Sequence, residues 1–259
     1  EIPLTSSTNT TIEVMQEPEI YIDAGMSPDT MVDSLGAVLN KYEVPIGLME
    51  KLMVLKEYDS LEFIIDDSGS MSLNSDTLDK DKQPQTRWQE AQHRLKEMIE
   101  ILAHLPFKQI EICFLNRDER ISIQRNKSAP QVFMEHAYQR IDQAFLQAPS
   151  GSTPALRKLK DSFAEGAGKS IARYFFGDGA PDGGVLAQHS IVDLLKNRTS
   201  PAKNPVTLIS CSDDEEQIKW MKVAEEIAPF CSEVDDFKRE SKEVMECQGA
   251  ALPYTFGFH

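Results

Sequence analysis

The sequence is short of positive charge and of long hydrophobic runs. Its 259 residues hold 27 Lys and Arg against 42 Asp and Glu, which gives a formal net charge of −15. Binding to a nucleic-acid backbone needs clustered Lys and Arg, so this balance argues against such a partner. No apolar run approaches the ~18 residues of a membrane-spanning helix, which argues against a membrane partner. The acidic balance favours the binding of cations or of basic surfaces instead.

The sequence also lacks the usual cysteine and histidine patterns. Its four cysteines show no C-x-x-C spacing and no arrangement typical of a secreted disulfide framework. Cys113 and Cys211 lie in apolar, strand-like runs, which predicts reduced thiols in the core. The five histidines form no H-x-x-x-H pair. This composition predicts an intracellular protein.

What the sequence does hold is an alternation of strand-like and helical segments. The runs LEFII, QIEICFL, IARYFF and PVTLISCS predict strands, and the first is apolar throughout, as in a strand buried on both faces. Helical spacing lies between them, most clearly after Thr86, which has capping-box spacing to Gln89. The run RISIQ follows a turn too short for a parallel crossover, so an antiparallel edge strand is expected there. The pattern predicts an α/β fold with a mostly parallel central sheet.

The chain is expected to divide into three parts. Residues 1–26 are polar and rich in Ser and Thr, which predicts a loosely ordered N-terminal segment. Residues 27–57 predict a helical hairpin, with Ser27 as its N-cap and proline in the first helical position. Residues 58–259 form the α/β domain, in which Ser212 is expected to cap the helix that starts in DDEEQIKWM.

The stretch FIIDDSGSMS ends an apolar strand in two aspartates and two spaced hydroxyls. Ligands of open α/β sheets bind at the carboxyl ends of the strands, where Asp66 and Asp178 both fall. A turn after a strand folds every second side chain inward, so Asp66, Ser68 and Ser70 are expected to converge. Oxygen atoms of this kind suit a small hard cation such as Mg²⁺. Thr153, in the loop PSGSTPAL, is a further candidate ligand.

These three pieces, in this order, resemble a known family. D-x-S-G-S-M after an apolar strand, a later G-S-T-P-A-L and a D-G after another strand resemble the von Willebrand factor A (vWA) domain over residues 61–248. The resemblance implies a Rossmann-like three-layer fold and the family's metal-ion-dependent adhesion site (MIDAS). It implies that Mg²⁺ or Mn²⁺ is held by Asp66, Ser68, Ser70, Thr153 and Asp178. It leaves one metal position open for an Asp or Glu of a protein partner, with Asp67 and Asp182 at the rim.

Two features separate the sequence from the adhesive members of that family. It shows no signal peptide or disulfide framework, and NSDTLDKDKQPQ lengthens the loop after the metal turn. It looks like the intracellular members found in lower eukaryotes and among effector proteins of intracellular bacteria. The resemblance implies a cytoplasmic protein, or one delivered into a host cell, that binds a partner and is not an enzyme. In related domains the last helix moves with the metal site, and here that helix is expected at residues 237–247.

Other interpretations stay open. Asp66 followed by the later FFGDGAPD also resembles a haloacid-dehalogenase-type phosphatase, with Asp66 as nucleophile and Asp178 and Asp182 as Mg²⁺ ligands. Its acid/base position, however, holds Ser68, whose pKa does not suit that role. A structural scaffold with a silent metal site is a third class, and a simple Asx/Ser turn with Thr153 as a helix cap is the plainest alternative. GAGKS at 166–170 mimics a phosphate-binding loop but lacks the first glycine and follows a helix.

Overall fold

The computed structural model of the chain describes residues 28–42, 44, 47, 49–79, 81–126, 128–212 and 214–234. The segment expected at 1–26, the cap expected at Ser27 and the helix expected at 237–247 lie outside the described residues. The α-helices in these ranges are α1 (Pro28–Lys41), α2 (Met49–Leu52), α3 (Arg87–Leu102), α4 (Pro130–Phe145), α5 (Ala155–Glu165), α6 (Gly184–Asn197) and α7 (Glu215–Ile227). The strands are β1 (Ser60–Ile65), β2 (Asn74–Leu78), β3 (Pro84–Thr86), β4 (Gln109–Phe114), β5 (Arg120–Gln124), β6 (Ile171–Gly177), β7 (Val206–Ser210) and β8 (Cys231–Val234).

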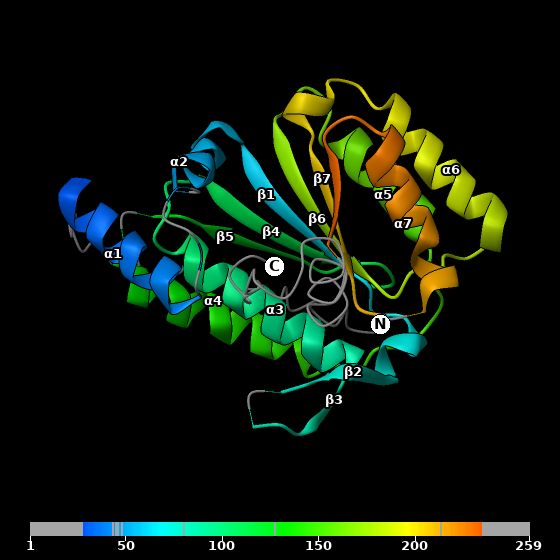
Figure 1. The fold of residues 1–259 in the computed structure, drawn as a ribbon, viewed down its shortest axis with the longest axis horizontal. Helices are drawn as coiled ribbons and strands as arrows, with labels where there is room; N and C mark the ends of the chain where they lie inside the picture. The colour runs from blue at the N-terminus through cyan, green and yellow to red at the C-terminus, as the bar shows by residue number, and fades with distance from the viewer. Residues whose placement is uncertain are drawn as a thin grey trace, which may run out of the picture.

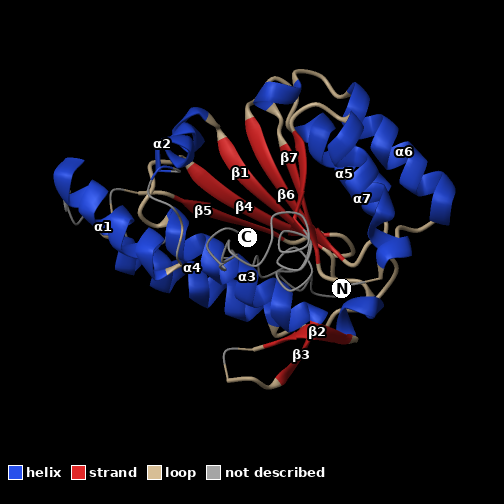
Figure 2. Cartoon of the chain, in the orientation of Figure 1, coloured by secondary structure: helices blue, strands red, loops and turns tan. Residues whose placement is uncertain are grey.

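A six-stranded sheet forms the middle of the fold (Figures 1 and 2). Its order is β5-β4-β1-β6-β7-β8, and every neighbouring pair is parallel except β4 and β5. The prediction of a mostly parallel sheet with one antiparallel edge strand is confirmed, because β5 lies at the edge and returns through a short turn. Strand β8 is not predicted by the sequence pattern, since it has four residues and only the first is buried.

Helices cover both faces of this sheet, which gives three layers (Figure 1). One core lies between the sheet and helices α1, α3 and α4, and the other lies under α5, α6 and α7. Successive side chains of a strand point to opposite faces, so Phe63 joins the first core and Ile64 the second. The architecture is therefore the Rossmann-like, three-layer α/β type that the sequence predicts. Of the helices in the described ranges, none is long and apolar enough to cross a membrane.

Two helix starts show how local sequence fixes an element. At α3, the Thr86 hydroxyl accepts from the Gln89 backbone N–H at 3.2 Å, and the Gln89 side chain accepts from the Thr86 N–H at 2.8 Å. This confirms the predicted capping box. At α7 the prediction is wrong, because Asp214 is the cap and its carboxylate accepts from Gln217. The Ser212 hydroxyl instead accepts from the Asp214 N–H at 3.2 Å. Asp214 precedes the first residue of α7, so this bond does not cap the helix.

The first helix shares the core of the sheet. Leu35 and Leu39 of α1 are buried in the same cluster as strand β1. Tyr42 donates its hydroxyl to Glu100 of α3 at 2.6 Å, and Lys41 pairs with the same carboxylate. The described residues from 49 to 57, in the second half of the expected hairpin, are helical. They form the single turn α2 and a 3₁₀ segment, Met53–Glu57.

The expected long loop after the metal turn holds a small hairpin. Strands β2 and β3 pair there in antiparallel fashion, and they lie against the start of α3 (Figure 2). Charged and polar residues fill this stretch, so the pattern gives no apolar alternation by which a strand would be recognised. The hairpin therefore depends on its turn and on α3 rather than on a core of its own.

The described cysteines lie in the interior. Cys113, Cys211 and Cys231 are free and buried. Burial raises the pKa of Cys113 to about 12 and that of Cys231 to about 11. The prediction of reduced core thiols is confirmed for Cys113 and Cys211.

Candidate metal centre

Asp66 and Asp178 meet at the carboxyl ends of two neighbouring strands. Strands β1 and β6 run parallel with Ile65 opposite Phe176, and the Asp66 N–H donates to the Phe176 carbonyl at 2.8 Å. The two aspartates follow these strands and are both fully buried. The structure therefore places both aspartates at the carboxyl ends of adjacent parallel strands, where the sequence pattern predicts them.

One carboxylate oxygen of Asp66 has no hydrogen-bond partner among the described residues. Its Oδ1 accepts from the Ser68 backbone N–H at 2.8 Å, while its Oδ2 is buried with no hydrogen-bond partner in the described part of the chain. Burial, followed by repulsion from Asp178, raises the pKa of Asp66 to about 7. A cation at this oxygen would supply the missing contact and lower that pKa.

Asp178 likewise has one carboxylate oxygen with a hydrogen-bond partner and one without among the described residues. Its Oδ2 accepts from Nη1 of Arg87 at 3.1 Å, and its Oδ1 is buried without a partner among the described residues. Arg87 opens helix α3 and its side chain is only 12% exposed. Sequence reasoning missed this arginine. A positively charged side chain in the first turn of a helix is unfavourable, because the helix dipole is positive there. This unfavourable position was the one sign in the sequence that Arg87 has another role.

The two serines of the motif lie together on the turn after β1. Ser68 and Ser70 have their hydroxyl oxygens 3.1 Å apart. Ser68 is buried and Ser70 half-buried, and a short 3₁₀ turn, Gly69–Ser72, holds the second serine. The predicted convergence of these side chains is borne out for this pair, while Asp66 is tied to the same turn through the Ser68 N–H.

The loop that carries Thr153 is joined to this turn by backbone bonds. The Gly69 N–H donates to the Gly151 carbonyl at 3.1 Å. Gly151 has φ of +99°, and a Cβ there would lie 2.9 Å from the side-chain oxygen of Asn116, so the close approach needs glycine. Thr153 is buried, and its backbone N–H donates to Asp182 Oδ1 at 2.9 Å. Helix α5 takes Pro154 as its N-cap, without a side-chain cap bond from Thr153.

The two expected rim aspartates differ in position. Asp182 is exposed, and it orients the Thr153 loop through bonds in both directions. Asp67 is not at an exposed rim, which corrects the expectation from sequence. It is buried, with Oδ1 accepting from the N–H and side chain of Asn116 and Oδ2 from Nε of Arg117 at 3.0 Å. These donors follow β4, so Asp67 ties the metal turn to the neighbouring strand.

The donor set defines which ion the residues fit. The described residues hold no group of three or more His, Cys, Asp or Glu side chains placed to bind a metal. The candidate ligands are instead two carboxylates and three hydroxyls, a set of hard oxygens. Such oxygens suit Mg²⁺ or Mn²⁺ rather than zinc. The two orphan carboxylate oxygens show that the residues present fit a cation of this class.

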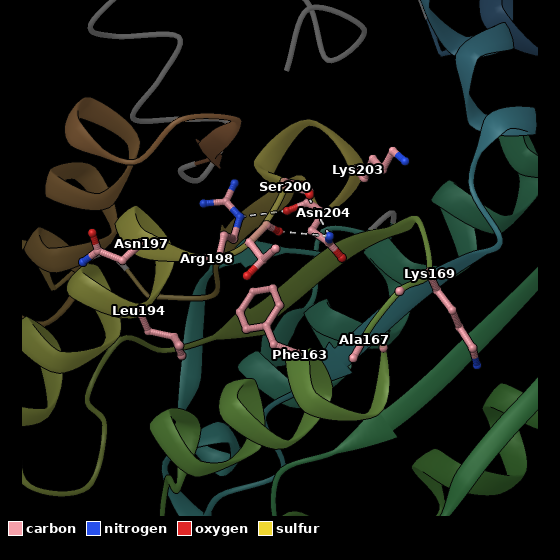
Figure 3. A pocket seen from close by; sticks show the side chains of 12 residues that line it. Phe163, Ala167, Lys169, Leu194, Asn197, Arg198, Ser200, Lys203 and Asn204 are labelled. Carbon is pink, nitrogen blue, oxygen red and sulfur yellow. Dashed lines mark hydrogen bonds between the residues drawn. The ribbon is translucent and has the colours of Figure 1, made fainter.

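A pocket lies near the amino ends of β6 and β7, away from the candidate metal centre, and Figure 3 shows the side chains that line it. It encloses about 490 Å³, and the loop that carries GAGKS lines one side of it. That loop joins the end of α5 to the start of β6, so the strand–loop–helix order of a phosphate-binding loop is absent, as expected. Arg198 on the pocket wall donates to backbone carbonyls, among them those of Asn204 and Phe230. Arg198 therefore ties the ends of α6 and α7 together.

Comparison with known proteins gives a likeness of structure only. No family model matches the sequence, and no curated protein matches it. One similar solved structure is an uncharacterized membrane-spanning protein from Vibrio fischeri, at 12% identity and a TM-score of 0.28, covering 74% of this chain and all of the other. Another is the conserved hypothetical protein BatB from Bacteroides thetaiotaomicron, at 12% identity and a TM-score of 0.41, covering 72% and 95%. Likenesses this distant carry no argument about function.

Proposed function

We propose that this chain is a vWA-type binding module and not an enzyme. In this proposal Mg²⁺ or Mn²⁺ binds at a MIDAS formed by Asp66, Ser68, Ser70, Thr153 and Asp178. The ion then holds an Asp or Glu side chain of a protein partner. The observation that carries the proposal is the pair of orphan oxygens, Asp66 Oδ2 and Asp178 Oδ1, buried at the ligand-binding edge of a parallel sheet.

Burial of these oxygens without a partner has a cost that a bound cation would remove. An unsatisfied buried polar atom costs roughly 1–3 kcal/mol, and more when the group is charged. Two such atoms, on aspartates that follow adjacent strands, are hard to explain as a simple turn. A divalent ion, when bound, supplies positive charge to both carboxylates and accepts further oxygen ligands.

The three candidate hydroxyl ligands come from two separate loops. Ser68 and Ser70 belong to the turn that also holds Asp66, so they are positioned together with it. Thr153 comes from a separate loop whose position depends on Asp182. A set with few carboxylates leaves a metal open to one more anionic ligand, and this is why an acidic partner is proposed.

The phosphatase alternative has less support from the geometry. It needs a carboxylic acid where the chain has Ser68, and that serine lies against Ser70 instead. It also needs Asp182 as a metal ligand, whereas Asp182 is exposed and bonded to Thr153. The intracellular setting, including delivery into a host cell, belongs to the same proposal and fits the free buried thiols.

An affinity pull-down tests the proposal directly. The tagged protein is incubated with cell extract in Mg²⁺ or in excess chelator, and captured proteins are identified by mass spectrometry. Asp66→Ala removes a candidate ligand, and Asp193→Ala removes an exposed carboxylate of α6 as a matched control. We expect a partner that is captured with Mg²⁺, lost in chelator, lost with Asp66→Ala and retained with Asp193→Ala.

Two outcomes would contradict it. A partner captured equally with Mg²⁺, with chelator and by Asp66→Ala would show that binding does not pass through the site. Hydrolysis of aryl phosphates by the wild type, abolished in Asp66→Asn, would favour the phosphatase.

A further inference from the structure

Arg87 reaches into the candidate metal centre from a different layer of the fold. It is the first residue of α3, and its backbone N–H donates to the Leu73 carbonyl at 2.9 Å, next to the metal turn. Its guanidinium then extends to Asp178, where Nη1 donates to Oδ2 at 3.1 Å. The carboxylate is fully buried and the arginine side chain is 12% exposed, so this ion pair is largely shielded from water.

The helix itself does not explain this arginine. Positive charge in the first turn faces the positive end of the helix dipole and is unfavourable there. The Thr86 and Gln89 capping box already satisfies the helix start without it. The contact that favours Arg87 is therefore the one with Asp178, a residue 91 positions away in the chain.

Counting charges shows what this contact does. In formal charges Asp66, Asp178 and Arg87 sum to −1, and the neighbouring buried pair of Asp67 and Arg117 adds nothing to this sum. A divalent ion brings it to +1, and one further carboxylate brings it to zero. Without Arg87 the two aspartates alone would neutralise the ion, and no acidic partner would be needed for charge balance.

We propose that Arg87 is a specificity-determining residue that keeps the metal-loaded site net positive, so that the site is completed only by an anionic group. This inference rests on the metal site of the proposed function. Arg87 weakens the hold on the ion, because its charge repels the ion and it shares Asp178 with it. Arg87 strengthens the hold on the incoming carboxylate, because the ion and the guanidinium then attract that carboxylate together.

The test measures metal and carboxylate binding separately. Arg87→Gln removes the charge but keeps an N–H for Asp178, and Arg87→Met removes both. Lys196→Met, at an exposed position at the far end of α6, is the control for loss of one positive charge. Mn²⁺ affinity is read from the electron paramagnetic resonance of free Mn²⁺. Acetate binding to the Mn²⁺-loaded protein is read from water-proton relaxation.

Arg87→Gln is expected to bind Mn²⁺ more tightly and acetate more weakly than the wild type. Arg87→Gln should bind Mn²⁺ about tenfold more tightly, because it removes the positive charge that shares Asp178 with the ion. Acetate should bind the loaded variant about threefold more weakly, because the charge of the guanidinium no longer attracts it. In chelator, Arg87→Gln should melt below the wild type, because Asp178 loses its counter-charge. Lys196→Met should match the wild type in all three measurements.

These measurements distinguish failure of the Arg87 inference from failure of the proposed metal site. If the wild type binds Mn²⁺ and Arg87→Gln binds Mn²⁺ and acetate with unchanged affinity, Arg87 has no such role and the proposed function stands. If neither the wild type nor the variants bind Mn²⁺, the metal site is absent and both proposals are overturned. A folded Arg87→Gln that binds acetate more tightly than the wild type would overturn the inference about Arg87 and leave the proposed metal site standing.

Discussion

Replacing Asp66 with asparagine should stabilise the metal-free protein. Asp66 is fully buried, and its Oδ2 lacks a partner among the described residues. In Asp66→Asn the amide oxygen can still accept from the Ser68 N–H, so that bond is kept while the buried charge is removed. The loss of repulsion from Asp178 adds to the gain.

The size of the effect follows from the pKa. Burial and Asp178 raise the pKa of Asp66 from 3.8 to about 7. At about 1.36 kcal/mol per unit, the ionised side chain destabilises the folded state by at most about 4 kcal/mol. Relaxation around the site reduces this, so Asp66→Asn is expected to add about 1–3 kcal/mol near pH 8. For a chain of this size that corresponds to a melting temperature higher by about 3–9 °C.

The pH dependence has a definite sign. Because the folded pKa lies above the unfolded one, the folded state keeps a proton that the unfolded state loses between about pH 4 and pH 7. The wild type therefore loses this contribution as the pH rises through that window, and the asparagine variant does not. The advantage of Asp66→Asn should be full near pH 8 and should shrink towards pH 4.

The assay is thermal unfolding in chelator, followed by circular dichroism at several pH values, and repeated in Mg²⁺. Mg²⁺ should raise the melting temperature of the wild type and leave Asp66→Asn unchanged, since binding to the folded state alone stabilises it. If Asp66→Asn melts below the wild type in chelator near pH 8, the carboxylate is better satisfied than we infer, and the reasoning fails.

Three further predictions concern the surroundings of the site. Thr153→Ala should keep its circular dichroism spectrum yet lose partner capture, whereas Thr153→Ser should keep most of it; equal capture by Thr153→Ala and wild type would make the threonine a structural residue only. Gly151→Ala should lower the unfolding free energy by about 1–3 kcal/mol in denaturant titration, because the backbone has positive φ and Asn116 blocks the new Cβ; an unchanged midpoint would contradict this. In a Cys247→Ser background, the thiols of Cys113 and Cys231 should react with Ellman's reagent at pH 8 only after unfolding, because burial raises their pKa values to about 12 and about 11; rapid reaction of the native protein would show that they are accessible.

The sheet, and the positions of Asp66 and Asp178 after adjacent strands, could be predicted because each depends on local pattern and a general rule. The apolar run of β1 predicts a strand buried on both faces, and parallel strands place their carboxyl ends at one edge. Residue spacing on the turn likewise predicts that Ser68 and Ser70 lie close together. These features need no knowledge of contacts between distant segments.

Features that depend on distant partners could not be predicted from the sequence. Asp67 resembles Asp66 in the sequence, and only the donors after β4 turn it into a buried structural residue. Arg87 is separated from Asp178 by 91 positions, and no local pattern links them. The cap of α7 depends on which of several adjacent acidic and hydroxyl side chains reaches the first N–H groups, and Asp214 rather than Ser212 does so.

The most direct test of the metal site is a crystal structure with Mn²⁺, using its anomalous scattering to locate the ion. The proposal predicts a single strong anomalous peak between Asp66 and Asp178, with Ser68 and Ser70 oxygens about 2.1 Å away. The same peak should be missing from crystals of Asp66→Ala grown with Mn²⁺. A wild-type map with no peak between these aspartates, from crystals soaked in excess Mn²⁺, would contradict it.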